Sequence, residues 1–186
     1  DTNRNLKINT QNLSYEKNKE IITTNKNSKA TFEDGKFIEA NSFEFDRDKN
    51  ILIALGQVKI EDTIENYLIT GDEFTYYKNQ EKIISKGVTE AFIKSKYEIT
   101  SKNVTYLVNE NELSSEDKTR IKDKNSQIYL IDKFVYLLKQ EILKGEKILL
   151  ITNYNLPKSD KIFLKNNIIN LKEKKFIGKD TLIEIH

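Results

Sequence analysis

The 186-residue sequence contains no cysteine, one histidine, one proline and six glycines. Without cysteine, the chain can form neither a disulfide framework nor a thiolate metal site. Its one histidine, His186, has no serine, aspartate or cysteine grouped with it as a catalytic set. Carboxylate pairs such as Asp46 and Asp48 fall in predicted turns, where aspartate hydrogen-bonds the local backbone. We therefore expect no enzymatic activity, no catalytic residues, no bound metal and no cofactor.

Long stretches of one charge or of apolar residues are also missing. The 31 basic and 29 acidic residues nearly cancel, which leaves a formal net charge of +2. The longest basic cluster, Lys172–Lys175, is interrupted by Glu173 and is unlike the basic stripe that nucleic-acid binding requires. Apolar runs such as Ile51–Leu55 are strand-sized, and none is long enough to cross a bilayer as a helix. No signal peptide is recognisable and residue 1 is Asp, so we expect a processed protein or a fragment.

What the sequence does contain is a repeat of about thirty residues. Each copy has an alternating strand that ends in an aromatic residue, then a polar turn, then a second apolar strand. The aromatic anchors recur at intervals of 30 or 31 residues, and a sixth, degenerate copy follows at Ile168–Leu171 and Phe176. The five anchors are Tyr15, Phe45, Tyr76, Tyr106 and Tyr136.

Alternation within each copy predicts strands rather than helices. In Gln57–Ile60, Val58 and Ile60 face one way and Lys59 the other, which is typical of a sheet with one apolar and one wet face. The segment 134–143 could be read as a helix, but it falls in register with four strand copies. Gly56 and Gly87 occupy equivalent places and suit a bulge where a strand turns a corner. The repeat therefore predicts an all-β, elongated structure of about five antiparallel strand pairs, with 1–186 as a single domain.

Particular motifs resemble those of OstA-like lipopolysaccharide-transport domains. These are Ala54-Leu-Gly-Gln-Val-Lys-Ile60, then Ile69-Thr-Gly-Asp-Glu-Phe-Thr-Tyr76, then Ile83-Ile-Ser-Lys-Gly-Val88. The resemblance covers about residues 10–185. It implies an open, V-shaped β-jelly roll, also called a β-taco, in the Gram-negative periplasm. Lipopolysaccharide would slide along its apolar interior for assembly at the outer membrane, and copies of the fold would join head to tail.

Within that family, the chain is most similar to the N-terminal periplasmic domain of the outer-membrane assembly member. The tail 176–186 resembles the link into that member's membrane barrel, and Lys161–Leu164 fits it better than the soluble bridge member. A departure is the absence of the cysteines that many such members carry here. The implied partners are lipopolysaccharide through its lipid A acyl chains, a bridge protein of the same fold, and an outer-membrane barrel with its plug lipoprotein. The soluble and the inner-membrane-anchored bridge members remain alternatives.

The predicted lipid-facing residues are the inward positions of the first and second strands of each copy. An alternative is that they fill a dry, closed core, because aromatic alternation in strands usually does. Register is open around 126–131, where Gln127 and Tyr129 or Ile128 and Leu130 could point inward. Two other interpretations compete with a lipid conduit: a β-solenoid enzyme or adhesin that acts on polysaccharide, and a structural scaffold. The predicted lining is Phe43, Phe45, Leu52, Ala54, Val58, Ile60, Ile69, Phe74, Tyr76, Ile83, Ile99, Val104, Tyr106, Leu113, Phe134, Tyr136 and Ile142.

Overall fold

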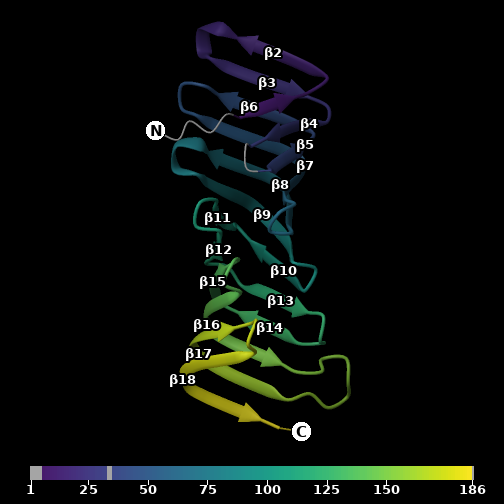
Figure 1. The fold of residues 1–186 in the computed structure, drawn as a ribbon, viewed down its shortest axis with the longest axis vertical. Helices are drawn as coiled ribbons and strands as arrows, with labels where there is room; N and C mark the ends of the chain where they lie inside the picture. Colours follow the sequence, from purple (N-terminus) through teal and green to yellow (C-terminus); the bar gives the residue numbers. More distant parts are fainter. Residues whose placement is uncertain (1–5, 33–34, 186) are drawn as a thin grey trace.

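The computed structural model describes residues 6–32 and 35–185. Eighteen strands of these residues stack along one long axis, with the N-terminal strands at one end and the C-terminal strands at the other (Figure 1). The described part of the chain has no α-helix, and its only helical segments are the short 3₁₀ turns η1 (Lys17–Lys19) and η2 (Lys78–Gln80). The predicted class, an all-β elongated β-jelly roll, is therefore confirmed. Residues 1–5, 33, 34 and His186 lie outside the described residues.

All strands belong to one antiparallel sheet. Their bounds are β1 (Lys7–Asn9), β2 (Asn12–Glu16), β3 (Ile21–Asn25), β4 (Ser28–Thr31), β5 (Lys36–Ala40), β6 (Ser42–Asp46), β7 (Ile51–Asp62), β8 (Tyr67–Tyr77), β9 (Lys82–Ile93), β10 (Tyr97–Lys102), β11 (Thr105–Leu107), β12 (Glu112–Ser115), β13 (Thr119–Asp123), β14 (Ile128–Ile131), β15 (Lys133–Leu137), β16 (Ile142–Ile151), β17 (Lys161–Asn170) and β18 (Lys175–Glu184).

This sheet folds lengthwise into two walls that face each other. The first wall contains β2, β3, β6, β11, β12 and β15, and the second contains β1, β4, β5, β10, β13 and β14. The six long strands β7, β8, β9, β16, β17 and β18 run through both walls. We call the line where the walls join the corner, and the opposite side, where the hairpin turns of both walls lie, the mouth.

The two glycines for which the sequence predicted bulges lie at the corner. Pairing between β7 and β8 shifts register between Leu55 and Val58, around Gly56, whose φ is +74°. Gly87 has a φ of +86° at the equivalent point of β9. This left-handed region is costly for residues with a Cβ, so glycine is favoured there. The prediction that both glycines let a strand turn a corner is confirmed.

Buried hydroxyl groups support the corner from inside. The Phe43 backbone N–H donates to Thr24 Oγ1 at 2.8 Å, where adjacent strands separate. The Val104 N–H donates to Ser85 Oγ at 2.7 Å in the same way, sixty-one residues further along the chain. A buried N–H group without a partner is costly, so these hydroxyls replace the ladder bonds that the bend interrupts.

The thirty-residue repeat corresponds to one hairpin of the first wall per copy. Each aromatic anchor pairs with the residue seven positions later across its turn, and the sixth copy pairs Ile169 with Phe176. The strand interpretation of 134–143 is confirmed by β15 and β16. The five anchor pairs are Tyr15 with Ile22, Phe45 with Leu52, Tyr76 with Ile83, Tyr106 with Leu113, and Tyr136 with Leu143.

Candidate functional site: the apolar interior between the walls

Two unbroken rows of side chains line the interior, one on each wall. Paired residues of neighbouring strands lie on the same face of a sheet, so the pairings define each row. The row of the first wall mixes aromatic and aliphatic residues: Tyr15, Ile22, Phe45, Leu52, Tyr76, Ile83, Tyr106, Leu113, Tyr136, Leu143, Ile169 and Phe176. The row of the second wall is mostly aliphatic: Ile8, Ala30, Ile38, Ile60, Ile69, Ala91, Ile99, Ile121, Tyr129, Leu150, Ile162 and Ile183.

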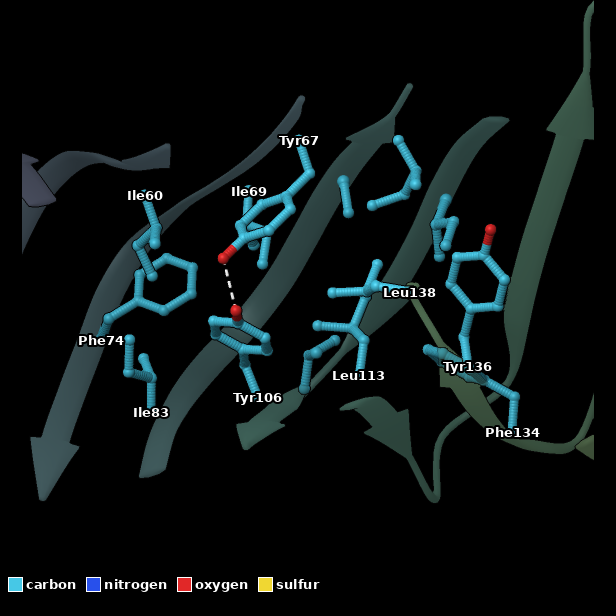
Figure 2. Packing of buried hydrophobic residues seen from close by; sticks show 14 of the residues in the cluster. Ile60, Tyr67, Ile69, Phe74, Ile83, Tyr106, Leu113, Phe134, Tyr136 and Leu138 are labelled. Carbon is cyan, nitrogen blue, oxygen red and sulfur yellow. Dashed lines mark hydrogen bonds between the residues drawn. The ribbon is translucent and has the colours of Figure 1, made fainter. Parts of the chain in front are cut away.

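The structure brings the predicted lining residues together in this interior. Fifteen of the seventeen are buried, and most of them are at most 3% exposed. Phe45 is partly buried and packs against the same cluster near its N-terminal end. Several of these residues, including Phe74, Tyr106 and Phe134, lie in one packed layer in Figure 2. Contact of any of them with a lipid stays a prediction.

One predicted position was placed on the wrong face. Ile142 faces outward and is only partly buried, whereas Leu143 is fully buried and pairs with Tyr136. The spacing of seven residues that pairs Phe45 with Leu52 and Tyr76 with Ile83 places Leu143, not Ile142, opposite Tyr136. Because side chains alternate, a shift of one residue moves a side chain to the opposite face.

Burial shows which side chains of 126–131 point inward, a register that the sequence left open. Tyr129 and Ile131 are 5% and 2% exposed and point inward, whereas Leu130 is 39% exposed on the outer face. Gln127 shares the inward parity, and its Oε1 accepts a hydrogen bond from the Tyr129 hydroxyl at 3.0 Å. Ile128 is outward in register yet buried.

Sequence reasoning missed most of the second wall, including three aromatic residues that face the anchors. Phe32 lies edge-on to Tyr76, with ring centroids 5.2 Å apart. Tyr67 meets Tyr106 in the same manner at 5.6 Å. Two of the missed residues, Tyr67 and Tyr97, are thirty residues apart, so the repeat itself carried a signal for them.

The two walls touch through side chains along the mouth. The hydroxyls of Tyr67 and Tyr106 share a hydrogen bond across the interior (Figure 2). Tyr97 packs edge-on to Tyr136 at 6.4 Å, and its hydroxyl donates to the Leu171 carbonyl at 3.4 Å. Among the described residues, no backbone–backbone hydrogen bond joins the walls on this side. The mouth therefore holds together without any part of the strand ladder.

Ion pairs complete the contact between the hairpin turns. Lys94 Nζ, from a turn of the second wall, lies 3.1 Å from Glu141 Oε1 in a turn of the first wall. Lys96 Nζ lies 3.5 Å from Glu141 Oε2. A separate ion pair joins Lys139 Nζ to Glu65 Oε1 at 3.7 Å. Burial alone would raise the pKa of Glu141, but the hydrogen bond and charge of Lys94, aided by Lys96, outweigh it and hold that pKa below its usual range.

Some buried polar groups in the interior have no partner within the described structure. They are the hydroxyl of Tyr136 and the side-chain amide of Asn167, which is 5% exposed. Burial raises the pKa of Tyr97 to about 12 and also raises the pKa of Tyr136. These phenols are therefore neutral at physiological pH, and the interior carries no charge from them.

The interior is open at both ends of the stack. Leu13 and Tyr15 on β2 are 57% and 41% exposed, although they lie on the inward face. At the other end, Phe176 and Ile183 on β18 are 41% and 50% exposed for the same reason. Each end therefore presents apolar side chains beside a strand edge, and within the described part of the chain β2 and β18 each pair with a single neighbour.

Within residues 6–32 and 35–185, no group of His, Asp or Glu side chains could hold a metal ion, and no helix is long and apolar enough to cross a membrane.

The sequence matches no protein-family model and no curated protein. A solved structure that resembles the fold is that of LptH, the LptA-homologous periplasmic component of the lipopolysaccharide transport device of Pseudomonas aeruginosa. The alignment has a TM-score of 0.32 and 10% sequence identity, and it covers 77% of this chain and 82% of LptH.

Proposed function

We propose that this protein transports lipopolysaccharide passively, by holding the acyl chains between its two walls. The observation that carries the proposal is the pair of apolar rows, which run in register through every strand layer from β1 and β2 to β18. Each methylene group kept out of water is worth roughly 0.8 kcal/mol, so a chain of about a dozen carbons gains on the order of 10 kcal/mol in such an interior. A lining that repeats at each step makes movement along it nearly level in free energy.

We expect a lipid to enter where the walls part at the mouth, because the two apolar rows pack against each other in a single buried cluster. Parting would break the hydrogen bonds Tyr67–Tyr106 and Tyr97–Leu171 and the ion pairs of Glu141 and Glu65, but no strand pairing of the described residues. An acyl chain would then replace contacts that the apolar rows make with each other. The Tyr136 hydroxyl and the Asn167 amide, which lack partners among the described residues, fit an interior that is not optimised as a permanent core.

The resemblance of the sequence motifs extends this proposal to a place in the cell. We assign the chain to the periplasm of a Gram-negative bacterium as the N-terminal domain of the outer-membrane assembly protein LptD, attached there through the barrel that would follow β18. Its exposed strand edges and apolar ends suit head-to-tail strand addition with a bridge protein of the same fold. The plug lipoprotein of that barrel would be a further partner.

Photo-crosslinking at two neighbouring tyrosines tests the conduit. Tyr76 is 1% exposed and points inward, whereas Tyr77, the next residue, lies on the outer face of the same strand. A photoreactive amino acid replaces one or the other in cells that make lipopolysaccharide. We expect lipopolysaccharide adducts from position 76 and from the equivalent Tyr106, but not from position 77 or from Lys59. Adducts only from the outward positions would reject the assignment of the interior.

A second candidate is a structural scaffold with a permanently closed core, which the near-complete burial of the predicted lining favours. The absence of native cysteines allows a direct comparison. Cysteines placed at Lys94 and Glu141 can be joined across the mouth by a short bismaleimide. The conduit predicts that joining them abolishes labelling at position 76, and that the singly substituted variants treated with the same reagent keep it. A scaffold predicts no labelling in any of these variants.

A further inference from the structure

Along the outer face of the second wall, the side chains of one row change from polar to apolar two thirds of the way from the N-terminal to the C-terminal end. One outward row runs through all twelve layers of that wall. Its first eight members are polar or charged and its last four are apolar. In order, they are Asn9, Lys29, Glu39, Lys59, Thr70, Glu90, Thr100 and Arg120, followed by Leu130, Leu149, Phe163 and Leu182.

The four apolar members, which we call the outer apolar row, are accessible. Leu130, Phe163 and Leu182 are 39%, 36% and 58% exposed, and Leu149 is half-buried. They sit side by side on β14, β16, β17 and β18, at the C-terminal end in Figure 1. Single exposed apolar side chains are common on protein surfaces, but four neighbouring ones in a row whose first eight members are polar mark a contact surface.

Basic residues border this row. A shallow hollow of about 460 Å³ brings Lys118, Arg120 and Lys147 together with Leu130 and Leu149. Its one acidic member, Asp132, is paired with Lys147 at 3.3 Å.

The sequence around these strands is also basic. From Ile142 to the end, nine lysines face five acidic residues, whereas the preceding part of the chain has two more acidic than basic residues. The strands β16 to β18, which carry three of the four apolar members, therefore lie in a part of the chain with a net positive charge. This combination of apolar side chains with a basic border is typical of a protein surface that rests on anionic lipid.

We propose that the outer apolar row and its basic border dock on an anionic phospholipid surface, independently of any lipid held between the walls. The apolar side chains would enter the boundary between headgroups and acyl chains, and Lys118, Arg120 and Lys147 would meet the phosphates. A second copy of the chain is a poorer occupant, because four partly exposed side chains fall short of the roughly 800 Å² per partner that a stable interface buries. Docking would place the C-terminal third of the domain against the lipid surface, with the long axis of the domain parallel to that surface.

Two single-tryptophan variants test this docking, since the chain has no native tryptophan. Phe163→Trp places the probe in the outer apolar row. Phe92→Trp is the matched control, because Phe92 is 37% exposed on the outer face of the same wall in its middle third. With vesicles of phosphatidylglycerol and phosphatidylcholine, we expect a blue shift and quenching by brominated lipid for Phe163→Trp only. Equal responses of the two variants, or no response of either, would overturn the proposal.

Substitutions on the same surface separate docking on lipid from pairing with a second copy of the chain. Leu182→Ser should weaken vesicle partitioning roughly fivefold, in line with losing one partly buried apolar side chain. Arg120→Glu with Lys147→Glu should weaken it roughly tenfold on anionic vesicles. Val88→Ser and Lys59→Glu, exposed positions elsewhere on the outer face, should leave it unchanged.

Sedimentation velocity without vesicles tests the other occupant. Dimerisation that is lost in Leu182→Ser would show that a second copy of the chain, not lipid, covers this surface, and would refute the proposal. A failure here leaves the photo-crosslinking at Tyr76 unaffected, so the two proposals are tested separately.

Discussion

The corner and the mouth of this molecule join the same two walls by different means. At the corner, six strands pass from one wall to the other, and buried hydroxyls such as those of Thr24 and Ser85 accept the backbone N–H groups that the bend releases. At the mouth, the described contacts are between side chains, or between a side chain and one carbonyl. Covalent continuity makes the corner a fixed line, whereas parting of the walls at the mouth would break no strand pairing of the described residues. Changes at the corner should therefore cost stability, and changes at the mouth should alter the ease of opening.

The largest effect is expected from removing a corner hydroxyl. In Ser85→Ala, the buried N–H of Val104 loses its acceptor, and we expect a loss of about 2–3 kcal/mol in the free energy of unfolding. Urea denaturation followed by circular dichroism measures this loss. Ser114→Ala, on the outer face of β12, is the control and should change stability by less than about 0.5 kcal/mol. A cost for Ser85→Ala no larger than that of the control would show that the corner does not depend on these hydroxyls.

The next effect distinguishes the two corner glycines from each other. Gly56 and Gly87 both have positive φ, but an added Cβ would lie 2.7 Å from Asn41 Nδ2 at Gly56 and would meet nothing within 4 Å at Gly87. We expect Gly87→Ala to cost about 1 kcal/mol from backbone strain alone. Gly56→Ala should cost about 2 kcal/mol, because Asn41 must also move. Equal melting temperatures for the two variants would argue that the bend, rather than its surroundings, sets the cost.

These corner glycines also show what the sequence could reveal about the fold. Gly56 and Gly87 recur at equivalent places in strands that otherwise alternate, and only a bend accounts for glycine there, so the corner was predictable. The anchors were predictable for a related reason, because aromatic residues at a fixed period stand out among aliphatic ones. The second wall was harder, since its inward row is mostly isoleucine and alanine, which occur on both faces.

The residues that line the candidate site could be predicted from the sequence, but the contacts that close its mouth could not. Alternation identified fifteen buried lining positions, and it failed at Ile142, where the seven-residue spacing of the other copies already pointed to Leu143. No pattern in the sequence indicated that Lys94 would lie beside Glu141, because the two are 47 residues apart and meet only through the crossing of the walls. Contacts across the mouth depend on that crossing, which a one-dimensional repeat does not specify.

A smaller, pH-dependent effect is expected at the mouth. Since the pKa of Glu141 is held below its usual value in the folded state, its ionised form stabilises the fold at neutral pH. That contribution is lost as the pH falls from about 4.3 through the folded pKa. Glu141→Gln should therefore cost about 1–2 kcal/mol at pH 7 and progressively less at lower pH. Thermal unfolding between pH 3 and pH 7 measures the difference, with the exposed Glu110→Gln as control. A constant difference across this range would contradict a role for the ion pair.

The smallest effect concerns the hydroxyl pair of Tyr67 and Tyr106, which joins the walls without charge. Burial raises the pKa of Tyr67 far above neutrality, so this contact should not change between pH 5 and pH 9, unlike that of Glu141. Tyr67→Phe and Tyr106→Phe should each cost about 1 kcal/mol, and the double variant should cost little more than either, which gives a coupling of about 1 kcal/mol in a double-mutant cycle. Additive costs would mean that the hydroxyls do not act on each other.

The same pair separates a mouth that opens from one that stays closed. If lipid enters by parting the walls, a weaker closed state means a larger open fraction, and a loss of about 1 kcal/mol allows up to about a fivefold increase in it. Labelling of lipopolysaccharide from a probe at Tyr76 should then rise in Tyr67→Phe, although the fold is less stable. Ser85→Ala, which weakens the corner and not the mouth, should not raise it. Equal labelling in Tyr67→Phe and the unsubstituted protein would place the entry of lipid at the exposed ends of the stack, because only a route through the mouth depends on that hydrogen bond.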